Sequence, residues 1–486
     1  MVRRIAKVLL QMGLGICVAS APALAQNAYS AAPAQSASTP APDISAITSD
    51  AIGWLQNLIR INTSNPPGNE LAAAKYIASI LDREGIHSEI FETAPGRGIL
   101  VARLSANAMP DPAHALLLMG HLDVVGVDKS KWKLDPFGGI VQDGYLYGRG
   151  AIDDKGMDAA NLAVMVALKR SGARLNRDVI LLCESDEEAG GDYGMKVAVE
   201  KYWDKIAAGY AINEGGRVIV KDGKVQYIGV QASEKVMVNV DVIATGTSGH
   251  ASMPRADNAV VHLAAAIAKI GTYETPVQFN SVTRGYFEGL AATQDEETAK
   301  WIRALDSPDR GDHAARWLSA ANPSWNSMMR DTITPTMLQA GIRQNVIPSE
   351  ARAVLNVRLL PGNMVQPLIA KLQQLVNDPQ IRFEVEPGAD EAAPSSSITS
   401  DLYNAIKSVA AREFPGAPVL PYMSTGATDS NFIRMRGVQS YGLLPFPLTD
   451  DDDLRMHADN ERIPVDSFRK GVDFLYQIVT NFAVSK

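Results

Sequence analysis

Short apolar runs alternate with longer amphipathic stretches in the first half of the chain. The runs "GILVARL", "HALLLMGHLDVV", "DVILLCES" and "YAIN" have the length and composition of buried strands. The stretches "AAAKYIASILDREG" and "DAANLAVMVALKRSG" repeat apolar residues at helical spacing. Strands that alternate with helices predict an α/β fold, with a mixed, largely parallel sheet flanked by helices.

The pattern changes after about Gln231. "KVMVNVDVIAT" alternates apolar and polar residues with period two, as a half-exposed strand does. A helical pattern follows, and later "ARAVLNVRLL", "VQPLIAKLQQLV" and "IRFEVEP" add strands and a helix. We therefore predict a first domain, residues 43–232 and 389–486, interrupted by an inserted α+β domain at residues 233–388. Charged, helix-prone sequence at about residues 287–330 forms a further insertion.

The first 25 residues have the pattern of a cleavable export signal. Basic residues precede an apolar stretch at residues 8–19 that is too short to span a bilayer, and "ALA" at residues 23–25 suits a cleavage site. Residues 26–42, rich in Ala, Ser and Pro, read as a flexible linker. We expect a periplasmic or secreted protein without an integral membrane segment after signal cleavage.

Composition narrows the class of protein further. A chain of 486 residues exceeds what one hydrophobic core usually serves, which agrees with two domains. The net charge of -8 and the pI of about 5.5 argue against a nucleic-acid partner, because phosphate binding needs a basic surface.

Acids and histidines follow strand after strand in the predicted α/β domain. Open α/β sheets place their sites at this carboxyl edge of the strands. The positions are His121 and Asp123 in "GHLDVV", Asp153 and Asp154 in "GRGAIDDKG", Glu187 and Glu188 in "ESDEEAGG", Glu214 in "INEGG" and, far downstream, His457 in "MHADNE".

Taken singly, most of these positions have simpler explanations. Acids before a helix suit caps, a run of Glu suits a solvated loop, and His121 with Asp123 suits a hydrogen-bonded pair in the core. Taken together, carboxylates that meet at one edge repel one another unless a cation neutralises them. A set of histidines and carboxylates without thiolates predicts two Zn²⁺ ions, with Co²⁺ or Mn²⁺ as substitutes.

Seven segments resemble, in the same order, the motifs of the M20 family of co-catalytic zinc metallopeptidases. They are "GHLDVV", "GRGAIDDKGM", "SDEEAGG", "NEGG", "GTSGHASMP", "NVIPSEARAVLNVRLLPG" and "MHADNERI". The resemblance runs from about residue 45 to the end of the chain. It is strongest to the carboxypeptidase S and Gly-Xaa carboxypeptidase branch, and the family also includes glutamate carboxypeptidase, aminoacylase and succinyl-diaminopimelate desuccinylase.

The resemblance implies a role for each position. His121 and Glu214 would bind the first metal, Glu188 and His457 the second, and Asp153 would bridge the two. The family fills the position of Asp154 variably.

Two further residues would support the reaction itself. Asp123 would orient His121, and Glu187 would act as the general base for a hydroxide that bridges the metals.

The resemblance also assigns residues of the inserted domain, which would act as a lid and dimerisation domain. His250 would donate to the oxyanion of the tetrahedral intermediate, from its own chain or from a partner. The sequence around His250, taken without the resemblance, suggests an ordinary loop histidine. Asn345, Arg343 and Arg358 would bind the carboxylate of the substrate, although an exposed Arg on an alternating strand explains them equally well.

Two acidic segments near the C-terminus complete the comparison with the family. Asp429, in "STGATDSNF", would serve in a substrate loop. The run of four acids at residues 450–453 departs from the family pattern. We expect a solvated loop there that disfavours acidic substrates by repulsion.

These observations predict an exported di-zinc metallohydrolase that cleaves an amide or peptide bond next to a free carboxylate. A carboxypeptidase or dipeptidase acting on short peptides is the leading prediction. An N-acyl-amino-acid amidohydrolase, an aminoacylase or deacylase that also runs in the synthetic direction, is the alternative. A prediction from outside the enzymes is a non-catalytic periplasmic binding protein on the same scaffold. Glu187 argues against it, because binding needs no general base.

Overall fold

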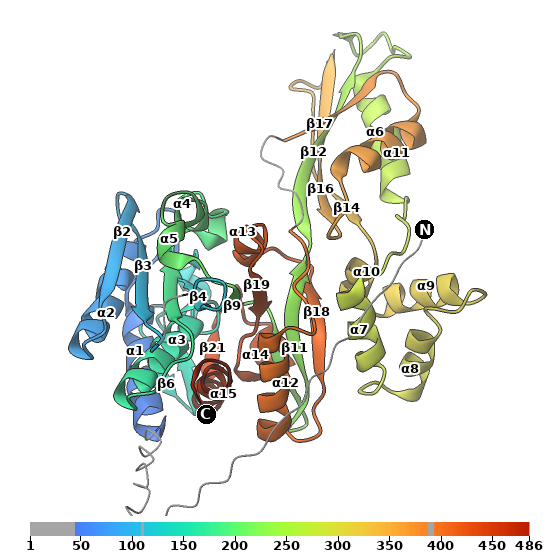
Figure 1. The fold of residues 1–486 in the computed structure, drawn as a ribbon. Helices are drawn as coiled ribbons and strands as arrows, with labels where there is room; N and C mark the ends of the chain where they lie inside the picture. The colour runs from blue at the N-terminus through green and yellow to red at the C-terminus, as the bar shows by residue number, and fades with distance from the viewer. Residues whose placement is uncertain (1–43, 108–110, 387–392, 486) are drawn as a thin grey trace, which may run out of the picture. The chain divides into compact units, whose positions relative to one another are not determined.

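A large mixed sheet contains the apolar runs that the sequence predicts as strands (Figure 1). The computed structural model describes residues 44–107, 111–386 and 393–485. The predicted export signal and linker lie outside the described residues. The centre of the sheet has the order β3-β8-β4-β9, in which β4 is parallel to β8 and β9 and β3 is antiparallel to β8. These strands are β3 (Arg97–Leu104), β4 (Leu116–His121), β8 (Val179–Glu184) and β9 (Tyr210–Asn213).

The sheet has 10 strands in the described residues, and its second half combines distant parts of the chain. The path runs from β9 through β19, β11 and β10 to β20, with β18 paired to β11 and β2 at the opposite edge. Strands from the N-terminal and C-terminal parts of the chain therefore form one sheet. The bounds are β2 (Ser88–Ala94), β10 (Arg217–Lys221), β11 (Lys224–Glu234), β18 (Val419–Ser424), β19 (Gln439–Gly442) and β20 (Pro447–Thr449).

Helix α3 (Lys155–Arg170) is buried along nearly its whole length. Most of its side chains are apolar, and its polar residues Lys155, Asp158 and Asn161 are buried as well, so other elements enclose the helix. It packs against β4 and against two further helices, α1 (Ile44–Arg60) and α15 (Val465–Ala483), each of which has one buried face. Helices α2 (Glu70–Arg83) and α12 (Asp401–Glu413) add to the same core.

A second, four-stranded antiparallel sheet has the order β14-β16-β12-β17. Buried and more exposed positions alternate along β16 (Glu350–Leu359), as the period-two pattern predicts. Helices α6 (Ala259–Gly271) and α11 (Val365–Val376) pack on this sheet around a hydrophobic core of their own. The other strands are β12 (Val236–Thr245), β14 (Thr332–Ala340) and β17 (Ile381–Val385). The predicted α/β fold with an α+β insertion is confirmed, while the domain boundaries stay a prediction.

The charged segment between β12 and β14 forms helices. They are α7 (Ser281–Leu290), α8 (Glu296–Arg303), α9 (Gly311–Ala321) and α10 (Pro323–Met329). Although the segment is inserted between strands of the small sheet, buried Val282, Phe287 and Leu318 belong to the core of the large sheet. Helix α7 contacts β18 directly.

Short elements complete the described part of the chain. Among the described residues, no helix combines the length and the apolarity that crossing a bilayer requires. The short strands are β1 (Ser64–Asn65), β5 (Val124–Val125), β6 (Ile140–Gln142), β7 (Tyr145–Tyr147), β13 (Gly249–His250), β15 (Val346–Ile347) and β21 (Arg462–Pro464). The short helices are η1 (Lys129–Lys131), η2 (Glu187–Ala189), α4 (Met195–Lys201), α5 (Trp203–Ile206), α13 (Ser430–Arg434) and α14 (Asp450–Asp453).

The acidic run at residues 450–453 is helical and not the loop that the sequence suggests, although Asp450 and Asp451 are exposed to solvent. It forms helix α14, capped by the Thr449 side chain. Arginines neutralise three of its acids, because Arg217 binds Asp453 at 2.7 Å and Arg462 binds both Asp451 and Asp452. These ion pairs weaken the expected repulsion of acidic substrates.

Candidate metal centre

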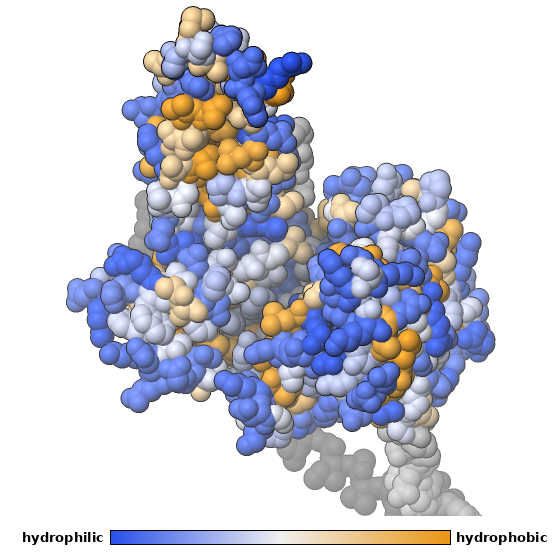
Figure 2. All heavy atoms as spheres, turned by 180° about the vertical axis from the view of Figure 1, so that it is seen from behind, coloured by the Kyte–Doolittle hydropathy of each residue, from blue (hydrophilic) through white to orange (hydrophobic). Residues whose placement is uncertain are grey.

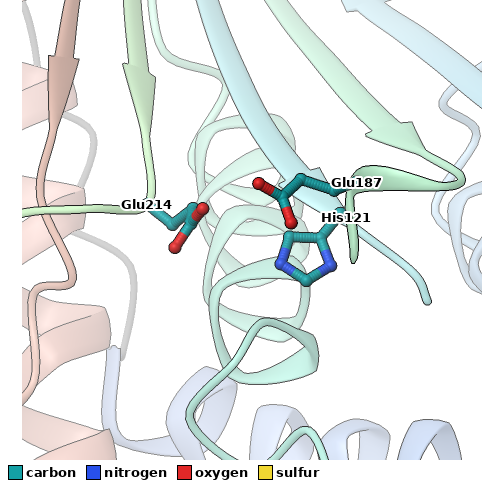
Figure 3. Close-up of side chains that lie close together, drawn as sticks. All are labelled: His121, Glu187 and Glu214. Atoms are coloured by element: carbon teal, nitrogen blue, oxygen red, sulfur yellow. The ribbon is translucent and has the colours of Figure 1, made fainter. Parts of the chain in front are cut away.

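Three neighbouring parallel strands deliver acids and a histidine to one edge of the large sheet. His121 is the last residue of β4, Glu187 begins η2 shortly after β8, and Glu214 directly follows β9. Since β8, β4 and β9 lie side by side, their carboxyl ends meet. Figure 3 shows the three side chains pointing toward one another.

The predicted metal ligands converge at this edge. The ligand atoms of His121, Glu187 and Glu214 lie within 4.8 Å of one another, and so do those of His121, Asp153 and Glu188. His457, which follows α14, joins the second group, since its Nε2 lies 3.0 Å from Glu188 Oε1. Side chains from positions 121 to 457 thus form one cluster.

Asp153 occupies the middle of the cluster. Its Oδ1 lies 3.0 Å from His121 Nε2, and its Oδ2 lies 3.1 Å from His457 Nε2. Burial opposes the charge of this carboxylate, but the hydrogen bonds with His121 and His457 hold its pKa below the usual value. A carboxylate that faces a different histidine with each oxygen has the geometry of a bridging ligand.

The acids around Asp153 are buried close together, so it costs free energy for all of them to be ionised at once. Burial and the repulsion of Asp153 raise the pKa of Glu214 to about 8. Burial, together with the charges of Glu214 and Asp429, raises the pKa of Glu187 well above its usual value. Hydrogen bonds to Asp153 and Glu188 raise the pKa of His457 to about 10. Each of these pKa shifts means that the cluster holds protons more tightly than usual. The cluster therefore favours added positive charge, which a bound cation would also supply.

Two of the simpler explanations do not fit the structure, although His121 and Asp123 do form a buried pair in the core. Asp154 is the N-cap of α3, yet its side chain makes no capping hydrogen bond. Instead it is fully buried and accepts the backbone N–H of His121 at 3.3 Å. The Glu188 side chain is only 6% exposed and does not belong to a solvated loop. The nitrogen and oxygen donors, without thiolates, fit zinc or a similar divalent ion.

Asp123 is fully buried beside His121 and supports the cluster from behind. One of its oxygens lies 3.6 Å from His121 Nδ1, the nitrogen that faces away from Asp153. Its oxygens also accept the backbone N–H groups of Glu187 and Glu188 at 3.1 and 3.2 Å. Burial opposes its charge, but these hydrogen bonds and those of His121 and Asn65 keep its pKa below the usual value.

Glu461 is a supporting residue that the sequence reasoning missed. This buried carboxylate accepts the backbone N–H groups of Gly150, Ile152 and Asp153 at 3.1, 2.8 and 3.2 Å. Arg149 holds it through an ion pair of 2.6 Å. Glu461 therefore fixes the loop that presents Asp153. Its place in the same "MHADNERI" segment as His457 was the available signal.

Four of the five residues predicted to meet the substrate lie apart from the cluster, whereas Asp429 lines a hollow together with Glu187. His250 and Asn345 are neighbours in the small-sheet region, where Ala251 N–H donates to the Asn345 carbonyl at 3.0 Å. Arg343 is exposed, and half-buried Arg358 donates to Asn356 at 3.1 Å. Within the described ranges, no hydrogen bond or ion pair joins His250, Asn345, Arg343 or Arg358 to the acids.

Two adjoining hollows open on the cluster. One, of about 260 Å³, is lined by Asp153, Glu187, Glu188, Glu214 and His457 together with Arg217 and Tyr422. The other, of about 160 Å³, contains Glu187 and Asp429 and is otherwise walled largely by apolar side chains. Burial raises the pKa of Asp429 to about 7. A larger cavity of about 360 Å³ lies between α7 and α8 and contains none of the predicted site residues.

Known proteins share both the sequence pattern and the fold. The profile of peptidase family M20/M25/M40 matches residues 117–481. "Probable carboxypeptidase S-like 2" of Dictyostelium discoideum is 28% identical over 75% of this chain and 71% of its own length. "N-fatty-acyl-amino acid synthase/hydrolase PM20D1" of Xenopus tropicalis is 30% identical over 75% of this chain and 72% of its own length.

A solved structure extends the likeness to the fold. The M20 family metallo-carboxypeptidase Sso-CP2 from Sulfolobus solfataricus matches with a TM-score of 0.66 and 21% identity, covering 90% of this chain and 99% of its own. The family profile alone spans most of the sequence, so the resemblance drawn from the motifs is confirmed. The chain belongs to peptidase family M20/M25/M40 and is a metallohydrolase of that family.

Proposed function

We propose that this enzyme uses two zinc ions to cleave an amide bond next to a free carboxylate, with short peptides as its leading substrates. The observation that carries the proposal is the convergence of His121, Asp153 and Glu188 with Glu187 among them. Glu214 and His457 would complete a set of five residues that could hold two ions, with Asp153 between the two groups. The relative named as a carboxypeptidase supports a peptidase.

Residues of the chain divide the chemical work between them. When bound, the two ions supply a water of lowered pKa and polarise the substrate carbonyl. Glu187 would accept the proton of the attacking water and deliver it to the leaving amine. Asp123 holds His121 in one orientation, because His121 Nδ1 donates to the Asp123 backbone carbonyl at 3.1 Å and the Asp123 carboxylate lies 3.6 Å from the same nitrogen.

His250 is placed to serve as an N–H donor to the oxyanion. Its Nδ1 accepts the backbone N–H of Ser252 at 3.1 Å, which leaves Nε2 to carry the proton of the neutral ring. Because His250 is exposed and lies apart from the acids, we propose that it acts in the active site of a partner subunit. Asn345, Arg343 and Arg358 would bind the substrate carboxylate from the same region.

A homodimer would use the edge of the small sheet. Strand β14 is an edge strand, and its Met337 and Leu338 are exposed. Figure 2 shows apolar side chains gathered in the region that Figure 1 labels β12, β14 and β16. An unpaired apolar edge is a natural pairing surface for a second chain.

The alternative substrate is an N-acyl amino acid. Val236, Met237, Ala427 and Phe432 give the hollow beside Glu187 an apolar surface that suits an acyl group. Lys235, Thr428 and Asn431 add polar groups to the same hollow. The relative named as an N-fatty-acyl-amino acid synthase/hydrolase supports this alternative and leaves open the synthetic direction. Both reactions break the same kind of bond and need the same ligands and base.

Export to the periplasm, or secretion, is part of the proposal. It rests on the signal-like pattern of residues 1–25. Expression of the full chain in a bacterium with a periplasm, followed by fractionation and sequencing of the mature N-terminus, tests it. An uncleaved chain that stays in the cytoplasm would argue against export.

The metal content and the substrate class need one experiment each. We expect close to two equivalents of zinc per chain by elemental analysis, and less than one tightly bound divalent ion would contradict the proposal. Purified metal-loaded enzyme is then assayed on dipeptides and on N-acyl amino acids that share the same C-terminal residue. Faster turnover of the dipeptides supports the peptidase, and the reverse supports the amidohydrolase.

A further inference from the structure

Asn65, at the end of β1, lies behind the metal cluster and contacts two acids at once. Its Nδ2 donates to Asp123 Oδ2 and to Asp186 Oδ1, each at 2.8 Å. The side chain is almost fully buried. The two hydrogens of one amide group thus join the loop of Asp123 to the loop of Asp186, which are far apart in the sequence.

The orientation of this amide follows from its third contact. Asn65 Oδ1 accepts from Arg97 Nη2 at 2.7 Å, and a guanidinium can only donate. Nδ2 must therefore face the two carboxylates. Arg97 is held in turn by Glu70 and lies 3.2 Å from Asp186.

The two acids that Asn65 contacts support different parts of the site. Asp123 flanks the ring of His121 and also accepts the backbone N–H groups of Glu187 and Glu188. Asp186 immediately precedes Glu187, and its other oxygen accepts the backbone N–H of Tyr193 at 3.0 Å. Its φ of 73° is a conformation that residues other than glycine rarely adopt, so the loop depends on such contacts.

We infer that Asn65 is a positioning residue that fixes the metal-binding ring of His121 and the base Glu187 relative to each other. It acts through Asp123 on one side and through Asp186 on the other. A neutral amide with two donors suits this place, because it separates two buried carboxylates that would otherwise face each other. The inference rests on the proposed function, since it assigns Asn65 to the same metals and base.

Substitution of Asn65 by Ser or Asp tests whether this residue positions the site or only stabilises the fold. Asn65→Ser is too short to reach both acids. Asn65→Asp keeps the acceptor for Arg97 but places a third carboxylate against Asp123 and Asp186. Asn69→Ser is the matched control, because Asn69 is exposed in the same segment and makes no side-chain cap for α2.

The readouts are zinc affinity of the metal-free protein, titrated against a chromophoric chelator, and kcat and KM measured separately. We expect both Asn65 variants to lose about 10- to 100-fold in zinc affinity, in kcat or in both, with Asp the worse and KM little changed. The control should match wild type. Variants that only melt earlier, with zinc affinity and kcat intact, would overturn the inference.

A second comparison holds even if the Asn65 variants are unstable. Asp186→Asn is isosteric and alters one of the two contacts of Asn65. If the amide works through Asp186, Asn65→Ser costs less in kcat when Asp186 has already been changed. Independent, multiplying losses would contradict the link. Failure of the wild-type protein to bind zinc would instead refute the proposed function and leave this comparison without its premise.

Discussion

The carboxyl group of Glu187 lies among the proposed ligands, yet a base and a ligand respond differently to substitution. Glu187→Gln keeps the shape of the side chain but cannot take a proton, so we expect kcat to fall about 100- to 10,000-fold. Zinc content should stay close to two equivalents. Elemental analysis and steady-state kinetics on the same preparation provide the measurement.

Glu188→Gln is the matched comparison for that prediction. Glu188 lies 3.0 Å from His457 and is a proposed ligand of the second ion, so its amide variant should lose bound zinc. If Glu187→Gln instead loses zinc and Glu188→Gln does not, the two roles are exchanged. If Glu187→Gln binds zinc and keeps its activity, Glu187 is not the base.

Residues at the strand ends were predictable from the sequence, whereas residues that support them were not. His121 and Glu214 interrupt or follow apolar runs, and parallel pairing alone brings such positions together. His457 is separated from strand β20 by helix α14, so only its motif identified it. Asn65 gave no signal, because a single Asn in the polar segment "NTSNPPG" reads as a turn residue.

At the scale of elements, the loop between β8 and α4 carries both Glu187 and Glu188, and it passes close to Ser185 at Gly194. A Cβ at Gly194 would lie 1.6 Å from the Ser185 carbonyl oxygen, so Gly194→Ala must displace this loop. We expect a loss of about 1–3 kcal/mol in stability, together with lower activity. Thermal unfolding and kcat provide the measurement.

A glycine elsewhere gives the opposite prediction and serves as control. Gly53 lies within helix α1, and a Cβ there would meet nothing within 4 Å. Gly53→Ala should therefore stabilise the protein by about 0.5–1 kcal/mol and leave kcat unchanged. If both alanine variants behave alike, the close approach of Gly194 to Ser185 does not govern the loop.

The elements themselves were predictable to a large extent, but their packing partners were not always so. Period-two and helical patterns identified β12, β16, α3 and α6, because each pattern reflects which side of that element is buried. The helices α7 to α10 show the limit. An amphipathic pattern reveals that a helix has an apolar face, not that this face packs on the large sheet.

At the scale of the whole molecule, the proposed dimer predicts complementation between two inactive variants. His250→Ala and Glu187→Gln are each expected to be nearly inactive. If His250 serves the partner's site, a mixed dimer restores one complete site, and an equimolar mixture regains about a quarter of the wild-type activity. Activity is measured after co-refolding of the two variants. A mixture that stays inactive would place His250 in its own chain's site.

Removing the metals should change how the stability of the whole protein depends on pH. Burial raises the pKa of Glu214 to about 8 and those of Asp158 and Asp429 to about 7, above their unfolded values of 4.5 and 3.8. The folded metal-free protein therefore holds more protons than the unfolded chain between about pH 4 and 7, so its stability falls as pH rises through that window.

Bound zinc would stabilise the deprotonated carboxylate of Glu214, a proposed ligand, so the loaded protein should show a smaller fall, and the gap between the two forms should widen with pH. Lys155, whose pKa burial lowers to about 7, opposes the trend only above that pH. Melting temperatures at pH 5, 6 and 7, with chelator and with excess zinc, check the prediction. A metal-free protein that melts later as pH rises from 5 to 7 would mean that these buried acids do not limit its stability.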